Sequence, residues 1–403
     1  MHVAILAPSH RSFISKFIRN YNIDDLPEVQ ATAPIIGIII SGLLEHNHKV
    51  TAITTSRSIG INDTVKSFSC GNFTWIVVPL RHHSFRFNGK RTGYMLDFFS
   101  VEQNSMLNCI KDIKPDVIHA HWSYEYAGVA IKSNLPCLVT IHDNAIQILL
   151  YFKNLYRLGR LLMSEYNLRL VKYASTVSPY MKDYSEKRCG TVRIIPNPVD
   201  INLLISDIEI ITLFKSKSLI IPKLIMINNG WDSRKNGLNA LIAFKQVLKH
   251  FPDATLDIYG SNSETGGLAY QDGTKLNIRN VNYHGSISHE QLLSAIDKSH
   301  LLIHPSLEES FGVVLIEAMS RGVPVIGGIK SGAVPWVIDN KELLIDVRMP
   351  DQIANKIIDL LSAPNIYRQL AIQSYKNVLY RFSSKIVVEK YLRYYNDIIK
   401  YWK

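Results

Sequence analysis

The stretch from His300 to Ile326 alternates between extended and helical patterns, and few folds accommodate that order. An apolar run over residues 300–303 leads into a polar turn, and a short helical segment follows. Gly322 has the position of a helix C-cap, and Pro324 stands where a helix can no longer continue. The next run, residues 323–326, is again short and apolar. This order predicts a βαβ unit, with its polar turn at the carboxyl edge of a parallel sheet, where ligands bind.

The same alternation recurs in both halves of the chain. Short apolar runs typical of buried parallel strands cover residues 3–7, 49–54, 75–80, 116–121, 224–230, 254–260 and 281–285. The length of 403 residues suits two domains of about 200 residues better than one core. We therefore predict an α/β fold with two Rossmann-like doubly wound parallel-sheet domains. Residues 201–222 carry little pattern and are expected to form a linker.

The charge balance indicates which partners suit the protein. Lysine and arginine exceed aspartate and glutamate by 45 to 34, a formal net charge of +11. The first 200 residues hold 22 basic and 15 acidic residues, so most of the excess lies there. A basic surface suits nucleic acid, anionic lipid or phosphorylated ligands. Because no nucleic-acid motif with interleaved aromatic residues is present, we expect a phosphate ligand or an anionic membrane surface, and no nucleic acid.

Membrane insertion, secretion and metal binding find little support in the sequence. The longest apolar runs, such as Ala33 to Leu44, are shorter than the ~20 residues that cross a bilayer. The first residues enter a strand without a basic n-region, so we expect no signal peptide. The cysteines show no metal-ligand spacing and are expected to be reduced thiols in the cytosol; they are Cys70, Cys109, Cys137 and Cys189.

The helix that starts after the polar turn offers a candidate anion site. Its first residues present backbone N–H groups without helical acceptors, namely Ser310, Phe311, Gly312 and Val313. Glu309 precedes the helix and Glu317 lies eight residues later, about 12 Å along a helix, so the two carboxylates cannot hold the same atoms. A sugar–diphosphate–ribose has hydroxyl groups on both sides of an anion and fits this spacing. Acids that only cap and solvate a surface helix would give the same pattern.

Two further strand ends carry candidate functional residues. Residues 116–122 read D-V-I-H-A-H-W, and strand alternation puts His119 and His121 on one side. No acid or cysteine at a suitable spacing completes a zinc site there. The next apolar run ends in His142 and Asp143.

Two basic segments also stand out in the first half. Residues 81–91 form a basic, aromatic loop that includes Arg81 and Arg86, which predicts an acceptor-facing or membrane-facing loop or an ordinary solvated one. Residues 151–173 have the pattern of one basic amphipathic helix.

Several of these motifs, in this order, resemble those of the family 4 retaining glycosyltransferases (glycosyl transferases group 1). The resemblance is carried by the H-x-V-T strand at 48–51, D-V-I-H-A-H-W at 116–122, I-P-N-P-V-D at 195–200, and E-x7-E between H-P-S and A-M-S-R-G-V-P-V-I. It implies the GT-B fold, in which two Rossmann-like domains face each other across a cleft. Residues 1–205 would bind the acceptor, residues 206–385 would bind the nucleotide sugar, and residues 386–403 would form a helix that crosses back to the first domain.

The resemblance also implies roles for individual residues. His121 and Glu309 would be the catalytic residues, with Glu309 on the sugar hydroxyls. The donor would be bound by Gly230, Arg234, Lys235, Ser310, Phe311, Gly312, Val313, Val314 and Glu317. The acceptor side would be formed by His119, His142, Asp143, Arg81 and Arg86. Two departures from the family pattern are Trp231, where an arginine is usual, and Thr32-Ala33-Pro34, where a glycine pair is usual.

The function implied is retaining transfer of a sugar from a nucleoside-diphosphate sugar to a hydroxyl of a glycan or lipid-linked acceptor. Cell-surface polysaccharide assembly, such as that of lipopolysaccharide or capsule, is the expected setting, with the enzyme cytoplasmic and peripheral on the inner face of the membrane. No metal or other cofactor is expected, because lysine and arginine supply the cations. A non-hydrolysing nucleotide-sugar epimerase and a catalytically inactive nucleotide-sugar-binding protein are the alternatives.

Overall fold

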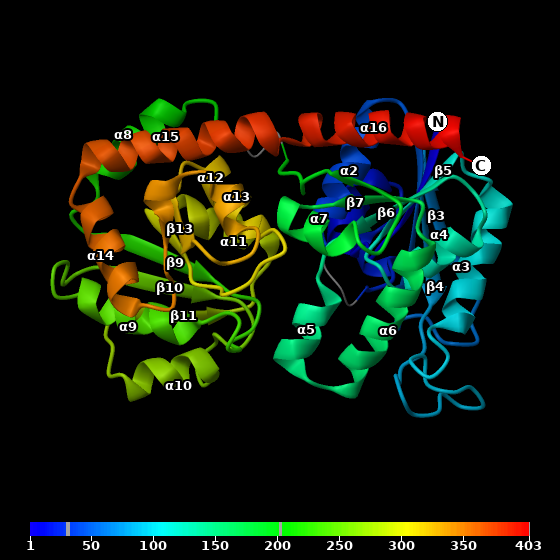
Figure 1. The fold of residues 1–403 in the computed structure, drawn as a ribbon, viewed down its shortest axis with the longest axis horizontal. Coiled ribbons are helices and arrows are strands. Elements are labelled where there is room, and N and C mark those ends of the chain that lie inside the picture. The colour runs from blue at the N-terminus through cyan, green and yellow to red at the C-terminus, as the bar shows by residue number, and fades with distance from the viewer. Residues whose placement is uncertain (30–32, 201–203, 403) are drawn as a thin grey trace. The chain divides into compact units, whose positions relative to one another are not determined.

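The computed structural model describes residues 1–29, 33–200 and 204–402, and it divides the chain into two compact units (Figure 1). The first unit consists of residues 1–198 and 384–403, and the second consists of residues 199–383. Each unit has its own parallel sheet and its own buried core. The prediction of two doubly wound parallel sheets is therefore confirmed.

The first unit is built on an eight-stranded sheet in the order β3-β4-β2-β1-β5-β6-β7-β8. Every neighbouring pair is parallel except β3 and β4, which are antiparallel. β5 and β6 are buried along their whole length, as expected where helices cover both faces of a parallel sheet. The strands are β1 (His2–Leu6), β2 (Lys49–Ser56), β3 (Lys66–Cys70), β4 (Phe73–Pro79), β5 (Val117–His121), β6 (Cys137–Ile141), β7 (Tyr173–Thr176) and β8 (Thr191–Ile194).

The helices of the first unit include the last helix of the chain. α16 buries Tyr394, whose hydroxyl donates to the backbone carbonyls of Ala174 at 3.2 Å and Thr191 at 3.1 Å. The helices are α1 (Arg11–Ile14), α2 (Pro34–Glu45), α3 (Ser100–Ile113), α4 (Glu125–Lys132), α5 (Ala145–Phe152), α6 (Leu155–Leu170), α7 (Pro179–Ser185) and α16 (Ser384–Tyr401), with short 3-10 turns at Ser15–Phe17 and Ile23–Asp25.

The second unit is built on a six-stranded, fully parallel sheet in the order β11-β10-β9-β12-β13-β14. Its strands are β9 (Lys223–Ile227), β10 (Thr255–Tyr259), β11 (Val281–Gly285), β12 (Leu301–His304), β13 (Val325–Gly328) and β14 (Leu344–Ile345). Its helices are α8 (Ile208–Lys217), α9 (Gly237–Val247), α10 (Leu268–Lys275), α11 (His289–Asp297), α12 (Val313–Ser320), α13 (Val334–Ile338), α14 (Pro350–Leu361) and α15 (Pro364–Arg381), with a 3-10 turn at Lys341–Leu343. The βαβ unit predicted at 300–326 is β12, α12 and β13.

Two sequence predictions differ from the structure. The expected linker at 201–222 contains α8, which packs on α15 and buries Thr212. The helix expected at 151–173 corresponds to α6 over residues 155–170, but residues 151–152 end the separate helix α5, which forms a hairpin with α6, and Tyr173 begins β7. Lys153 adopts a left-handed conformation that ends α5, and the Asn154 side chain accepts the backbone N–H of Arg157 at 2.9 Å to start α6.

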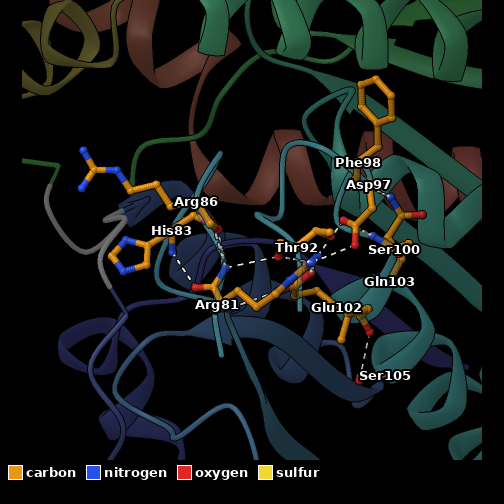
Figure 2. A network of polar contacts seen from close by, with 12 residues as sticks. Arg81, His83, Arg86, Thr92, Asp97, Phe98, Ser100, Glu102, Gln103 and Ser105 are labelled. Atoms are coloured by element: carbon orange, nitrogen blue, oxygen red, sulfur yellow. Dashed lines mark hydrogen bonds and ion pairs between the residues drawn. The ribbon is translucent and has the colours of Figure 1, made fainter. Parts of the chain in front are cut away.

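Arg81 is fully buried, in contrast to the exposed loop residue that the sequence predicts. Its guanidinium donates to both oxygens of Glu102 at 2.9 and 2.7 Å and to both oxygens of Asp97 at 2.7 Å (Figure 2). The remaining N–H donates to the carbonyl of Thr92 at 3.0 Å. All five guanidinium donors are thus used inside the unit. The prediction that Arg81 contacts an acceptor is therefore wrong, whereas Arg86 is exposed and stays a candidate.

Replacing Arg81 with methionine should destabilise the first unit strongly. The Arg81→Met variant leaves the buried Glu102 and the mostly buried Asp97 without their cation, which typically costs about 3–5 kcal/mol. Urea unfolding of the full chain should show a clearly lower midpoint for the first unit. Arg193→Met is the control, because the ion pair of Arg193 with Asp397 is exposed and should contribute less than about 1 kcal/mol. Equal midpoints for the two variants would contradict this account.

Candidate active site

The strongest polar cluster of the second unit lies where β9 and β12 end. Lys235 follows β9, and Glu309 follows β12 and precedes α12. Lys235 Nζ lies 2.6 Å from Glu309 Oε1, and the two side chains are only 11% and 13% exposed. Two residues that are 74 positions apart in sequence therefore form one mostly buried ion pair at the carboxyl edge of the sheet.

The turn that carries Lys235 is held by backbone hydrogen bonds. Asp232 Oδ1 accepts the backbone N–H groups of Arg234 at 2.9 Å and Lys235 at 3.3 Å. Gly230, with φ of 111°, provides the left-handed conformation that lets the chain leave β9. The backbone N–H of Leu307 donates to the carbonyl of Arg234 at 2.7 Å and joins this turn to the segment after β12. The position of the ammonium is therefore set by the backbone as well as by Glu309.

Glu309 is held in its ionised form. Burial alone would raise its pKa, but the positive charge of Lys235, with His304 and Arg234 nearby, outweighs burial and holds the pKa of Glu309 well below its usual range. His304 Nε2 lies 3.5 Å from Glu309 Oε1. An ionised carboxylate is a hydrogen-bond acceptor only, so this group suits the hydroxyls of a sugar.

Two further residues of this turn, Arg234 and Trp231, have different environments. Arg234 Nη1 lies 3.6 Å from Glu308 Oε2, and both side chains are mostly buried. The Trp231 indole donates to Asp272 Oδ2 at 2.9 Å and packs over Gly237, where an added Cβ would come within 2.4 Å of the ring. Trp231 thus packs on the start of α9, and Arg234 remains the candidate second cation beside Lys235.

The start of α12 lies directly after Glu309. Gly312 has φ of 84°, and an added Cβ would lie 2.8 Å from the Leu315 side chain, so this position requires glycine. The first N–H groups of the helix, on Val313 and Val314, have no acceptor within the helix. The ring of Phe311 is buried against the rings of Trp336 and Phe382, and anchors the turn. The helix therefore begins at Val313, so Ser310 and Phe311 precede it instead of forming its first turn, and anion binding at this place stays a prediction.

Glu317 lies inside α12 and has a partner of its own. Its carboxylate is 2.7 Å from His289 Nε2 at the start of α11. This hydrogen bond raises the pKa of His289 against the opposing effect of burial. Glu309 and Glu317 thus have separate basic partners.

Three polar side chains that the sequence analysis missed lie at the same strand ends. Among the residues that the structure describes, no hydrogen-bond partner is found for the side-chain atoms Asn228 Nδ2 and Oδ1, His304 Nδ1 and Nε2, and Ser306 Oγ, all buried. Buried polar atoms without partners are costly and often indicate a missing ligand or water. In the sequence, these residues could be recognised because they directly follow apolar runs that predict strands, in N-N-G at 228–230 and H-P-S at 304–306.

In the first unit, His119, His121 and His142 lie together at the ends of β5 and β6. The rings of His119 and His121 have centroids 4.0 Å apart, which agrees with their predicted place on one side of the strand. His121 Nδ1 shares a hydrogen bond with His142 Nε2 at 2.9 Å, while no partner is found for His121 Nε2 among the described residues. His119 is fixed on both ring nitrogens, by Thr140 Oγ1 at 2.6 Å and the Tyr395 hydroxyl at 2.6 Å.

Burial determines the charge of this histidine cluster. It lowers the pKa of His142 to about 3 and that of His119 and His121 well below the usual value, so all three imidazoles are neutral at neutral pH. Burial also raises the pKa of Asp143, which accepts a hydrogen bond from the Tyr124 hydroxyl at 3.1 Å. In residues 1–29, 33–200 and 204–402, no three or more His, Cys, Asp or Glu side chains are arranged so that they could hold a metal ion.

The Lys235→Met variant should reveal the electrostatic coupling to Glu309. The low pKa of Glu309 means that its ionisation stabilises the wild-type fold above about pH 4.5, and this stabilisation is lost as the pH falls toward the lowered pKa. Without the lysine, the pKa of Glu309 should rise, so the melting temperatures of wild type and variant should differ most near neutral pH and converge below about pH 4.5.

Lys249→Met, which removes an exposed lysine of the same unit, is the control for this measurement. Its melting temperature should run parallel to that of the wild type at every pH. If the melting temperature of Lys235→Met differed from that of the wild type by the same amount at every pH, the coupling would be refuted.

Two protein-family models match the chain, one over each half. The model described as Glycosyltransferase Family 4 matches residues 38–203, and that described as Glycosyl transferases group 1 matches residues 215–377. Together they span both sheets except for β1 at the amino-terminal end.

Sequence relatives agree with these models. An uncharacterized glycosyltransferase of Methanocaldococcus jannaschii is 23% identical over 368 residues, 86% of this chain and 88% of the relative. The N-acetyl-alpha-D-glucosaminyl L-malate synthase of Bacillus anthracis is 34% identical over 104 residues, which is 25% of this chain. The match spans only 27% of the length of that synthase.

Solved structures share the fold over nearly the whole chain. Sucrose-phosphate synthase from Thermosynechococcus elongatus has a TM-score of 0.72 at 16% identity and covers 99% of both chains. Anabaena HepE in complex with UDP and glucose has a TM-score of 0.68 at 16% identity, over 98% of this chain and 100% of the other. Given a family model over each half and this shared GT-B fold, the chain belongs to glycosyltransferase family 4 (glycosyl transferases group 1), a retaining family whose members use nucleotide sugars.

Proposed function

We propose that this enzyme moves a sugar from a nucleoside-diphosphate sugar to a hydroxyl of a glycan or lipid-linked acceptor, with retention of configuration. The observation that carries the proposal is the mostly buried ion pair of Lys235 and Glu309 beside the start of α12. A cation, an ionised carboxylate and helix-start amides without helical acceptors in one place match a donor that is part diphosphate and part polyol. The buried polar atoms of Asn228, His304 and Ser306 add further hydrogen-bonding capacity to this place.

The leaving group determines what the second unit must do. When the bond to the anomeric carbon breaks, negative charge grows on the diphosphate, and preorganised cations and amides stabilise it. Lys235, Arg234 and the amides from Ser310 to Val314 would provide this stabilisation, with Gly230 allowing close approach. Lys235 would then exchange part of its contact with Glu309 for the diphosphate. This arrangement needs no metal ion, since side chains and a helix start supply the positive charge.

The two carboxylates suit the two polyol ends of a donor. Glu309 is ionised and would accept hydrogen bonds from hydroxyls of the transferred sugar. Glu317, about one turn into α12, would accept from the ribose while keeping or exchanging its contact with His289. Each carboxylate has its own basic partner, Lys235 for Glu309 and His289 for Glu317. These separate partners support the assignment of the two carboxylates to opposite ends of the donor.

The first unit would supply the groups closest to the acceptor. We assign the reacting sugar to His121, whose Nε2 is buried without a partner among the described residues and whose ring is neutral. His119 would hold that ring in place, and His142 and Asp143 would lie toward the acceptor, with Arg86 in the exposed loop. Arg81 has no part in this set, because its donors are all used internally.

The setting that we propose is assembly of a cell-surface polysaccharide at the inner face of the membrane. The support is the net charge of +11 and the exposed Arg86 in a loop with exposed phenylalanines. None of the helices in the described parts of the chain is long and apolar enough to cross a membrane. An acceptor with an anionic lipid carrier would suit such a surface.

The Glu309→Gln variant tests the proposed donor site. A panel of nucleotide sugars is first screened by thermal shift, because a bound donor raises the melting temperature. With the donor so found, the variant should lose about 10²-fold or more in transfer rate, since the amide donates where an acceptor is needed. Glu290→Gln, at an exposed acid of α11, should keep the wild-type rate. Unchanged transfer by Glu309→Gln would refute the assignment.

The same assay distinguishes a transferase from the two alternative functions, a nucleotide-sugar epimerase and an inactive nucleotide-sugar-binding protein. An epimerase would convert the donor to an epimer without an acceptor, and an inactive binding protein would show a thermal shift without any turnover. Sugar transfer that depends on an added acceptor is the result expected here.

The stereochemistry of the product is a further prediction. Retention means that an α-linked donor gives an α-linked product, because the acceptor attacks on the face from which the diphosphate leaves. Proton NMR of the product should therefore show the coupling of an α anomer when the donor is α-linked. A β-linked product would contradict the retaining mechanism.

A further inference from the structure

The hairpin of α5 and α6 exposes a long row of large apolar side chains, unlike the other helices of the first unit. On α6, residues at helical spacing share one face, and Leu155, Leu162 and Tyr166 are 73%, 55% and 65% exposed. We call this surface the hairpin face, and its members are Leu150, Phe152, Leu155, Leu158, Leu162, Tyr166 and Leu170. In Figure 1 the hairpin extends away from the sheet of its own unit.

Packing within the unit does not explain the hairpin face. The opposite side of α6 buries Met163 and Leu168, and α6 packs on α4 and α5. Met163 belongs to a cluster that includes Met95 and Phe99. α6 therefore already has the apolar side that its own unit requires. A second, exposed apolar row of this size is typical of an interaction surface.

The segment around Met95, which packs on α6, also exposes apolar side chains. Met95 lies under α6, since a Cβ added at Gly159 would come within 2.9 Å of its sulfur. On either side of Met95 in the sequence, Phe87 is 71% exposed and Leu96 is 59% exposed. The same loop carries the exposed Arg86, so apolar and basic groups are mixed here as they are on the hairpin.

The charges of the hairpin indicate the kind of partner. Lys153 is exposed at one end and Arg169 at the other, where its side chain is 73% exposed. Residues 145–170 contain one acid, Glu165, whose carboxylate lies 2.7 Å from Arg188 and 3.9 Å from the exposed Arg169, so the longer contact of Arg169 leaves its side chain open to solvent. A second copy of the chain, laid against the face in either direction, would place basic residues against basic residues. An anionic surface is complementary at both ends.

We propose that the hairpin face docks on a membrane surface that contains anionic lipid. The leucines, Phe152 and Tyr166 enter the boundary between headgroups and acyl chains, while Lys153 and Arg169 bind lipid phosphates. The hairpin lies in the plane of the interface and does not cross it. The proposal rests on the proposed function only in its purpose, which is to bring the enzyme to a lipid-linked acceptor.

Sedimentation with vesicles tests the proposal on the full-length protein. Wild type should bind vesicles of phosphatidylcholine mixed with phosphatidylglycerol, and bind phosphatidylcholine alone much more weakly. The Leu155→Gln/Leu158→Gln/Leu162→Gln variant should lose at least tenfold in affinity. Its matched control, Ile210→Gln/Phe214→Gln/Ile220→Gln, removes exposed apolar side chains of the second unit and should bind as wild type does.

The basic residues are tested separately. Each should contribute about fivefold to affinity, so Lys153→Gln/Arg169→Gln should bind anionic vesicles more than tenfold less tightly and with a weaker dependence on salt. Lys275→Gln/Arg393→Gln removes the same charge from exposed sites elsewhere and should change little.

Three results would overturn the docking proposal. They are no binding of wild type to anionic vesicles, equal losses in the two apolar variants, and a concentration-dependent dimer in sedimentation equilibrium that the Leu155/Leu158/Leu162 variant abolishes. Thermal shift with the donor needs no vesicles, so the three-leucine variant should keep it. Failure of docking and failure of the proposed function are therefore distinguishable.

Discussion

The proposed donor site depends on the mostly buried ion pair of Lys235 and Glu309. Taking an ammonium and a carboxylate out of water is costly, and their attraction repays this cost only with close geometry and further polar partners. Here the distance is 2.6 Å, but the side-chain polar atoms of Asn228 and Ser306 and His304 Nδ1 find no partners among the described residues, and His304 Nε2 lies only within 3.5 Å of Glu309. The cluster is therefore incompletely satisfied as a purely structural element. A polar ligand would complete it, which is the physical reason to regard it as a binding site.

The last helix of the chain has a comparable role for the first unit. The Tyr395 hydroxyl contacts His119 Nδ1, and burial raises the pKa of that hydroxyl well above its usual value, so it stays neutral. With Thr140 on the other ring nitrogen, His119 has no freedom to turn, and the His121 ring stacks close to it. A residue near the carboxyl terminus thus fixes a strand end near residue 120. The packing of α16 on the first unit is consequently part of how the histidine cluster is ordered.

The sequence predicts regular elements well and pairings poorly. The β12–α12–β13 unit, the histidines on one side of β5 and the glycine at the start of α12 follow from local periodicity and backbone geometry. The helix α8 does not, because its stability comes from packing on α15, which is distant in sequence. Likewise, nothing near Lys235 indicates that Glu309 is its partner. The sequence does not single out Asn228, His304 and Ser306, because polar residues after a strand are common and only the structure shows that these are buried with unpaired polar atoms.

Arg81 shows why net charge alone does not locate a binding surface. Its loop is basic in sequence, yet Asp97 and Glu102, 16 and 21 residues later, use all its donors inside the unit. Arg160 is similarly enclosed, with its guanidinium 3.6 Å from the centre of the Tyr124 ring and bound to Glu125. These paired, buried cations stabilise the fold and contribute little to the electrostatic potential at the protein surface. The exposed Lys153 and Arg169 differ, because they flank a row of exposed apolar side chains. Basic residues beside apolar surface, more than total charge, distinguish a lipid-facing surface from an ordinary solvated one.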